Sequence, residues 1–255
     1  MIADIQGKSI HYIQEGQGQD VLILHGWGGS VQTVRPIVDF LKPHFCVTAL
    51  DLPGFGESDL PEKAYDSYDY AHVVKCFILT LELFNPIVMG HSHGGRIGII
   101  LASDLELGIQ KLVLIDSAGI VPKKSLGSQL KVFCFKKLKN MYMLMTPKER
   151  QQERMEAFYK RFGSEDYQQA QGVMRQTMVK VIHDDLKHLL PKIEAPTLLF
   201  WGEKDDATPL YMGQMMAEMI KDAGLVTVKN GGHYAYVDDF ILFKVVIESF
   251  LNVSK

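Results

Sequence analysis

Short apolar runs rich in valine, isoleucine and leucine recur along the chain and alternate with segments of helical periodicity. The runs are apolar on both faces and end in turn residues, a pattern typical of strands buried in a parallel sheet. Six such strands are predicted, within residues 20–26, 45–51, 86–92, 111–119, 196–205 and 225–233. Two further strands, at 2–5 and 9–14, are only a few residues apart, so we expect them to form an antiparallel hairpin.

Helical patterns separate most of these runs. They are predicted at about residues 31–41, 68–83, 94–103, 208–221 and 238–251. Strand and helix alternating in this way predict a doubly wound α/β fold with a mostly parallel, eight-stranded sheet.

One region, from about Val121 to Pro191, contains no convincing strand and interrupts the alternation. It follows the strand predicted at 111–119, which is the sixth in chain order when the hairpin strands are counted. An insertion on the carboxyl side of a parallel sheet would cover the place where such sheets bind ligands, so we interpret it as a helical lid. The predicted domains are a core of residues 1–120 and 192–255 and a lid of residues 121–191.

Two helices are expected within this lid. The first spans residues 146–163, with Thr146 as N-cap, Pro147 at the first helical position and Glu149 completing a capping box. The second helical pattern spans residues 172–190.

Composition narrows the class of protein. The chain has 255 residues, 47% of them hydrophobic and 22% charged, as in an ordinary soluble domain of this length. A net charge of −3 gives no sign of nucleic-acid binding. No signal peptide, transmembrane run or CxxC pair is evident, so a reducing cytoplasm is expected.

The predicted lid is rich in basic residues. Between residues 121 and 161 there are 11 Lys and Arg but only 3 Asp and Glu. A solvated helix face is the favoured interpretation, and attraction of anionic substrates or a membrane surface is the alternative.

The motif Gly90-His91-Ser92-His93-Gly94 follows an apolar run and precedes a helical pattern. Strand, tight turn and helix in this order form the setting of a nucleophile elbow, which makes Ser92 the candidate nucleophile. A helix that starts here leaves the backbone N–H of His93 free to face a developing oxyanion. The glycine-rich "HGWGG" after the strand at 20–24 offers a second donor, assigned to the backbone N–H of Trp27.

The general base has nine candidate histidines. His91 and His93 are the nearest in sequence, but side chains on either side of a tight elbow diverge from the serine. His25 is expected to make a structural hydrogen bond instead. His233 is favoured, because its glycine-rich loop after the last predicted strand can lower the ring onto Ser92.

The orienting acid should follow a strand and lie between the serine and the histidine in sequence. Asp205 is favoured, with Asp206 beside it facing another way. Asp116, at the end of the strand at 111–115, is a rival that could reach the same histidine. Asp51 precedes the serine and is expected to cap a turn.

Five segments together resemble the α/β-hydrolase superfamily: "HGWGG", "DLPGFGES", "GHSHGGR", "WGEKDDATP" and "GGHYAYVD", in the family's order. The resemblance implies Ser92 as nucleophile, His233 as base and Asp205 as its partner, with the N–H groups of Trp27 and His93 as oxyanion hole. It also implies a cap after the sixth strand. Members with an aspartate nucleophile, the dehalogenases and epoxide hydrolases, have Asp where this chain has Ser92, so those activities are not expected.

The expected function is therefore hydrolysis of carboxylic esters with small or medium acyl chains, through an acyl-enzyme intermediate. The substrate would be a small-molecule ester with an apolar acyl group. No metal or organic cofactor is expected, because no His, Cys and Asp cluster has metal-ligand spacing. A carbon–carbon bond hydrolase, a thioesterase and a lactonase could use the same three residues. A slow-turnover ligand receptor that kept the triad is a further alternative.

Overall fold

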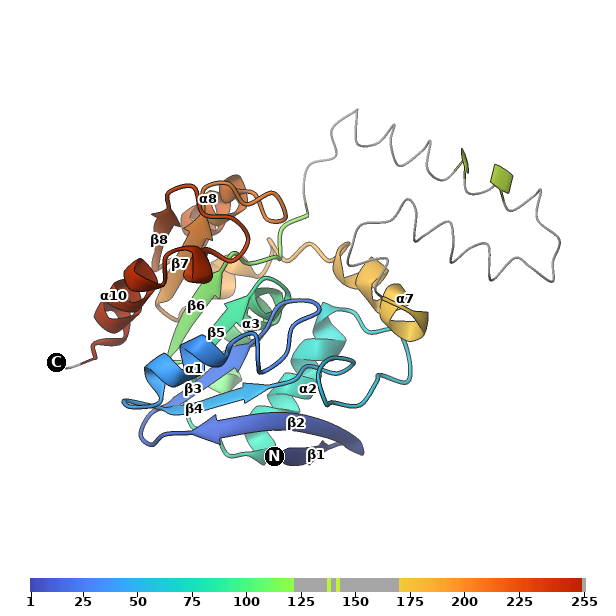
Figure 1. Cartoon of the computed structure of the whole chain (residues 1–255), viewed down its shortest axis with the longest axis horizontal. Coiled ribbons are helices and arrows are strands. Elements are labelled where there is room, and N and C mark those ends of the chain that lie inside the picture. Colours follow the sequence, from blue (N-terminus) through green and yellow to red (C-terminus); the bar gives the residue numbers. More distant parts are fainter. Residues whose placement is uncertain (122–136, 139–140, 143–169, 254–255) are drawn as a thin grey trace.

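A computed structural model of the chain describes residues 1–121, 137–138, 141–142 and 170–253. It contains an eight-stranded sheet with the strand order β1-β2-β4-β3-β5-β6-β7-β8 (Figure 1). The strands are β1 (Ile2–Ile5), β2 (Lys8–Glu15), β3 (Asp20–Leu24), β4 (Cys46–Leu50), β5 (Ile87–His91), β6 (Lys111–Ile115), β7 (Thr197–Gly202) and β8 (Ala223–Val228). The hairpin of β1 and β2 and the pairing of β2 with β4 are antiparallel, and all other pairs are parallel. The predicted fold class is confirmed.

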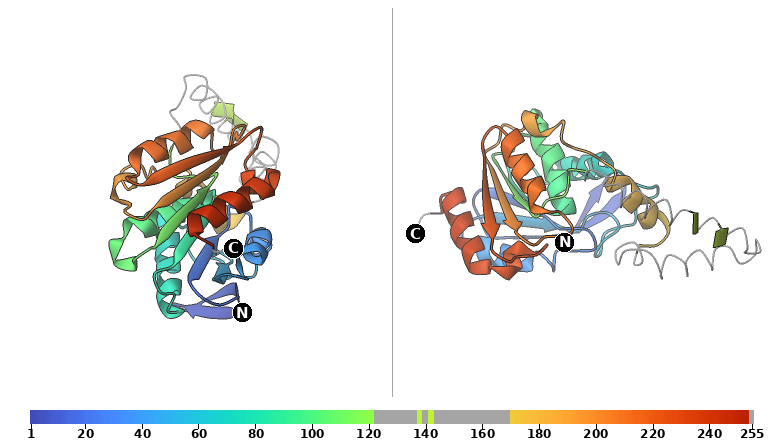
Figure 2. Two further views of the ribbon diagram at one scale, coloured as in Figure 1. Left: turned by 90° about the vertical axis from the view of Figure 1, so that its left-hand side faces the viewer. Right: turned by 90° about the horizontal axis from the view of Figure 1, so that it is seen from above.

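Helices cover both faces of this sheet. Those in the described ranges are α1 (Arg35–Leu41), α2 (Ser67–Thr80), α3 (His93–Ser103), α7 (Gly172–Val181), α8 (Leu210–Met219), α9 (Ala235–Asp238) and α10 (Phe240–Leu251), with short 3-10 turns η1 (Leu105–Leu107) and η3 (Leu190–Lys192). Figure 1 shows α1 and α10 on the near side of the sheet, and Figure 2 shows the sheet twisting between the two helix layers.

The core is divided by the sheet into two apolar clusters, because successive side chains of a strand point to opposite faces. On β3, Leu22 and Leu24 join the cluster that contains α2, α3 and α8. Val21 and Ile23 join the cluster with α1 and α10. All four side chains are buried, which explains why the parallel strands contain consecutive apolar residues rather than apolar residues at alternate positions.

The first predicted helix is shorter than expected. It begins at Arg35 rather than near residue 31. The Thr33 hydroxyl donates to the Ser30 carbonyl at 2.7 Å and accepts the Ser30 N–H, which holds residues 30–33 in a separate turn. Pro36 then fits the first turn of α1, where its missing N–H costs no helical hydrogen bond.

The segment between β6 and β7 differs in part from the prediction. The helix expected at residues 146–163 lies outside the described residues. The second expected helix ends at Val181 instead of continuing to residue 190. Beyond it, Asp184 holds other partners: its carboxylate accepts the Ser67 N–H at 2.8 Å, and its carbonyl accepts a hydrogen bond from Arg96 at 2.6 Å. These tertiary bonds replace the helical ones.

Candidate active site

The turn between β5 and α3 holds Ser92 in a strained conformation, with φ 49° and ψ −108°. Positive φ is uncommon for a residue with a side chain and must be enforced by its surroundings. Here the Ser92 N–H donates to the Ile115 carbonyl of β6 at 3.0 Å. A Cβ atom on Gly90 would overlap the Gly94 carbonyl, and one on Gly94 would overlap the Leu24 carbonyl. The two glycines of the motif are therefore required by space.

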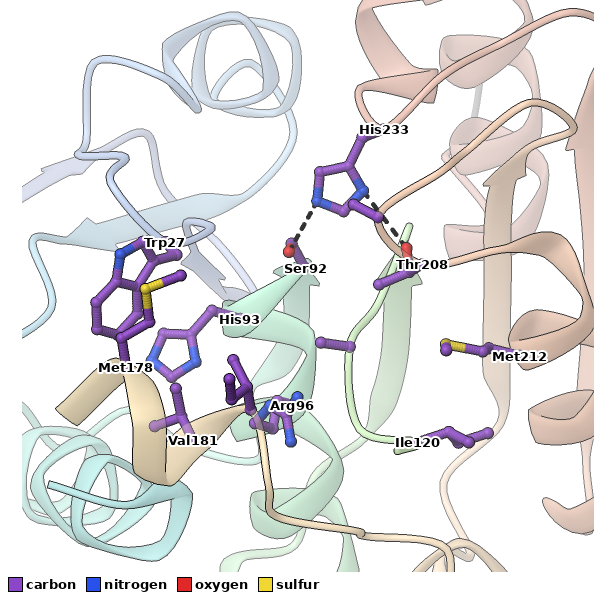
Figure 3. Close-up of a pocket in the computed structure, with 13 residues that line it drawn as sticks. Trp27, Ser92, His93, Arg96, Ile120, Met178, Val181, Thr208, Met212 and His233 are labelled. Carbon is purple, nitrogen blue, oxygen red and sulfur yellow. Dashed lines mark hydrogen bonds between the residues drawn. The ribbon is translucent and has the colours of Figure 1, made fainter. Parts of the chain in front are cut away.

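Side chains from the carboxyl ends of three strands meet at this turn. His233, in the loop after β8, has Nε2 2.9 Å from the Ser92 Oγ (Figure 3). Its Nδ1 lies 2.8 Å from Oδ2 of Asp205, which follows β7. A carboxylate can only accept, so Nδ1 carries the proton and Nε2 is the acceptor for the serine hydroxyl. The three residues singled out in the sequence thus form one chain of hydrogen bonds.

Asp205 is held by its own loop as well as by His233. Its Oδ1 accepts the N–H groups of Ala207 and Thr208, and its Oδ2 lies 2.7 Å from the Thr208 hydroxyl. Burial alone would raise the pKa of Asp205, but the hydrogen bonds from His233 and Thr208 outweigh it and hold the pKa below its usual value. Asp205 is therefore an ionised carboxylate facing the imidazole.

Asp116 has different partners. Its Oδ1 accepts the Gly202 N–H at 2.8 Å and its Oδ2 accepts the Ala235 N–H at 2.9 Å, and no hydrogen bond joins it to His233 in the described part of the chain. Burial raises the pKa of Asp116 to about 7. The side chain ties the ends of β6 and β7 to the start of α9, directly after the His233 loop.

The other histidines near the serine make structural contacts. His91 Nε2 lies 2.7 Å from the carbonyl oxygen of His233 and so supports that loop. His25 contacts the Gly26 carbonyl through Nδ1 and accepts the Leu52 N–H through Nε2. Asp51 accepts N–H groups from two loops, at Val31 and Glu57, as a turn-capping residue does.

Two backbone N–H groups stand beside the serine with no acceptor. They belong to Trp27, after β3, and to His93, at the first position of α3; among the described residues, neither N–H is engaged in a hydrogen bond. Free donors at a helix N-terminus next to a serine are suited to binding an oxyanion.

A cavity of about 280 Å³ opens beside Ser92 (Figure 3). Apolar side chains from α7, α8 and the loops line most of it: Trp27, Ala118, Ile120, Met178, Val181, Ile182, Ala207 and Met212. Its polar lining comes from Ser92, His93, Arg96, Thr208 and His233. Such a cavity suits a small apolar group with a few polar contacts.

Two of these polar residues were missed in the sequence, Thr208 and Arg96. Thr208 follows Asp205 by three residues, a spacing at which an aspartate can cap the next backbone N–H groups, and this signal could have identified it. Arg96 follows Ser92 by four residues and so lies on the same helix face, and this spacing could also have identified it from the sequence.

In the described ranges, no cluster of three or more His, Cys, Asp or Glu side chains is placed to hold a metal ion. None of the helices described there is long and apolar enough to cross a membrane.

Comparison with known proteins places these features in a wider group. A family model described as "alpha/beta hydrolase fold" matches residues 21–240. The chain is 28% identical over 249 residues to the AB hydrolase superfamily protein YisY of Bacillus subtilis (strain 168), covering 93% of each. It is 26% identical over 252 residues to Lipase 3 of Moraxella sp. (strain TA144), covering 87% of this chain and 73% of the lipase. The solved structure of a membrane phospholipase A, a bacterial virulence factor, superposes with a TM-score of 0.77 at 26% identity, covering 99% of this chain and 85% of that one.

Proposed function

The chain belongs to the α/β-hydrolase family, and from this membership we propose that it is a serine hydrolase that cleaves carboxylic esters of small or medium acyl chains. The observation that carries the proposal is the hydrogen-bond chain from Ser92 through His233 to Asp205 at the mouth of an apolar cavity. A serine beside a histidine that is oriented by a carboxylate is the arrangement that activates a hydroxyl for acyl transfer.

In the first half of the proposed reaction, the Ser92 Oγ attacks the ester carbonyl while its proton passes to Nε2 of His233. Asp205 stabilises the imidazolium that forms. The N–H groups of Trp27 and His93 bind the oxyanion of the tetrahedral intermediate, and each donor contributes about 3 kcal/mol to the transition state. The intermediate then expels the alcohol, which takes the proton from His233 and leaves an acyl group on Ser92.

In the second half, a water molecule replaces the alcohol. It gives a proton to His233 and attacks the acyl carbonyl, and the second tetrahedral intermediate expels Ser92 Oγ, which regains the proton. One ester and one water thus become one carboxylic acid and one alcohol. No metal or organic cofactor enters this scheme.

The cavity and the relatives support an ester substrate of limited size. A volume of about 280 Å³ lies near the lower end of ligand pockets, which suits a small or medium acyl chain. Lipase 3 and the membrane phospholipase A carry names of enzymes that cleave esters. A serine at position 92, rather than an aspartate, supports acyl transfer over the chemistry of dehalogenases and epoxide hydrolases.

We further propose that residues 121–191 form a lid over a core of residues 1–120 and 192–255. The described part of this segment supports the proposal, because Met178 and Val181 of α7 line the cavity. Hydrogen bonds also hold α7 against the loop before α2: the Thr177 hydroxyl accepts the Tyr65 N–H at 3.0 Å, and Lys180 donates to the Ala64 carbonyl at 2.8 Å.

The proposal is tested with purified protein and a series of p-nitrophenyl esters from acetate to dodecanoate. We expect hydrolysis with a maximum at short or medium chains. A fluorophosphonate probe should label Ser92, as located by mass spectrometry of the digested protein. Labelling without hydrolysis of any ester would contradict ester cleavage and direct the search to thioesters, lactones and carbon–carbon bonds. Neither labelling nor hydrolysis would favour a ligand receptor.

A further inference from the structure

Arg96 is a buried cation in the wall of the cavity. It lies one helical turn after the serine, with its backbone N–H donating to the Ser92 carbonyl at 3.2 Å. Only 6% of its surface is exposed. Figure 3 shows it between Val181 and Ile120, on the side of the cavity opposite to His233.

The charge of Arg96 has no carboxylate partner among the described residues. Its Nη1 donates to the backbone carbonyl of Asp184, but the Asp184 carboxylate accepts the Ser67 N–H, and the Asp185 carboxylate pairs with Lys187 at 2.9 Å. Burial lowers the pKa of Arg96 to about 10, and the charges of Asp184 and Asp185, which do not pair with it directly, oppose this shift, so the guanidinium remains charged at neutral pH. A buried cation whose nearest counter-charges are not hydrogen-bonded to it is costly, and an anionic ligand in direct contact would offset this cost.

His93 is a second unsatisfied group in the same wall. Both of its ring nitrogens are buried and have no hydrogen-bond partner among the described residues. Its ring packs edge-on against Trp27 and Tyr70, with ring centroids 5.5 and 4.8 Å from its own. Burial holds the pKa of His93 well below its usual value, so the ring is neutral and offers one donor and one acceptor. Buried polar groups are normally hydrogen-bonded, so an unpaired one in the wall of a cavity needs a partner, which a ligand can supply. The ring lies between Trp27 and Arg96 in Figure 3.

Building on the proposed ester cleavage at Ser92, we propose that Arg96 and His93 form a carboxylate-binding subsite and that the natural acyl group carries a carboxylate. The planar guanidinium matches the two oxygens of a carboxylate. The backbones of Ser92 and Arg96 differ by one helical turn, a rise of about 6 Å, and both side chains line the same cavity, so a chain of a few methylene groups suits a substrate that contacts both. The apolar side chains of Ile120 and Met212 in the same cavity suit those methylenes. The substrate class is therefore the monoester of a short dicarboxylic acid.

The test compares monomethyl adipate with methyl hexanoate. The two esters have acyl chains of the same length, but only monomethyl adipate carries a free carboxylate. We expect the wild-type kcat/KM to be at least about tenfold higher for the adipate ester. In Arg96→Gln, the ratio of the two kcat/KM values should fall by about thirtyfold. Arg96→Lys keeps the positive charge but lacks the planar pair of N–H donors, so the ratio should fall less in this variant than in Arg96→Gln. Arg35→Gln removes the same charge from α1, remote from the cavity, and should leave the ratio unchanged.

A merely structural Arg96, which holds the Asp184 carbonyl in place, would lower kcat/KM for both esters alike, and this outcome would overturn the proposal. A wild-type preference for methyl hexanoate would also overturn the proposal, and this preference can be measured without any variant. Binding gives a readout that does not depend on turnover. Calorimetry of Ser92→Ala with monomethyl adipate should detect binding that is lost in Ser92→Ala/Arg96→Gln.

The two proposals can fail separately. Binding of monomethyl adipate to Ser92→Ala, with no ester hydrolysed by the wild type, would contradict ester cleavage and leave the subsite standing. Hydrolysis of both esters, with no preference for the adipate ester and no binding, would overturn the subsite alone.

Discussion

The Oγ of Ser92 and the Nε2 of His233 lie 2.9 Å apart although 141 residues separate them in sequence. The parallel sheet explains the approach, because β5 and β8 both end at its carboxyl edge. Ser92 is fixed by the strained turn after β5. His233 is fixed on two sides: its carbonyl contacts His91, and its ring contacts Asp205. The geometry therefore depends on loops anchored to strands rather than on residues close in sequence.

Replacing Ser92 with Ala should lower kcat for p-nitrophenyl esters by about 10⁴-fold or more, because the attacking oxygen is removed. The variant should fold, since the Ser92 side chain makes its hydrogen bond with His233 and caps no helix. Ser103→Ala is the matched control: this serine lies at the last position of α3, and its hydroxyl donates to the Ile100 carbonyl at 2.8 Å. Equal activity of Ser92→Ala and Ser103→Ala would rule out Ser92 as the nucleophile.

The choice between the two acids is tested by Asp205→Asn and Asp116→Asn. Asn at 205 would turn a donor or a neutral oxygen toward Nδ1 of His233, so kcat should fall by roughly 10⁴-fold. Asn at 116 can keep one of two N–H hydrogen bonds, and the His233 ring keeps its carboxylate, so the loss should be below about 10²-fold. Steady-state kinetics and thermal unfolding of both variants check this. If Asp116→Asn alone were inactive, the assignment of Asp205 would be wrong.

Much of the fold could be predicted because the information is local. A strand buried on both faces contains a run of consecutive apolar residues, and this run predicted the starts of β3, β4, β5, β6 and β7 to within a residue or two. The elbow was readable because Gly90 and Gly94 are required by contacts within the motif and with β3.

What the sequence did not reveal depends on contacts between distant segments. The helix expected through residue 190 ends at Val181 because Asp184 bonds instead to Ser67 and Arg96, residues far away in the chain. The support of the His233 loop by His91 is of the same kind. Thr208 and Arg96 were within reach of local reasoning from spacing, but their partners became visible only in three dimensions.

Thr208 is expected to be a positioning residue for Asp205. Its hydroxyl lies 2.7 Å from the Asp205 Oδ2 and 3.0 Å from the Asp116 carbonyl. Thr208→Val keeps the shape and removes the hydroxyl, so kcat should fall by about tenfold, the size of one hydrogen bond to a charged group. Thr208→Ser restores the hydroxyl and should recover most of kcat. Rescue by Ser distinguishes a hydrogen-bonding role from packing; if Ser were as impaired as Val, the hydroxyl alone would not account for the loss and the positioning role would be wrong.

His91 should make stability depend on pH. Burial lowers the pKa of His91 from 6.5 to about 4, and its Nε2–H donates to the His233 carbonyl at 2.7 Å. Between pH 6.5 and 4, His91 therefore binds fewer protons in the folded state than in the unfolded state, so its contribution to stability is lost as the pH falls through this window. The shift corresponds to a loss on the order of 3 kcal/mol. His91→Gln can still donate to the carbonyl but does not titrate. In urea unfolding, the free energy of unfolding at pH 7 minus that at pH 4 should thus be smaller in His91→Gln than in the wild type, since His25, His93 and Asp116, whose pKa values are also shifted, are common to both proteins. Identical losses would mean that His91 titrates alike in the folded and unfolded chains.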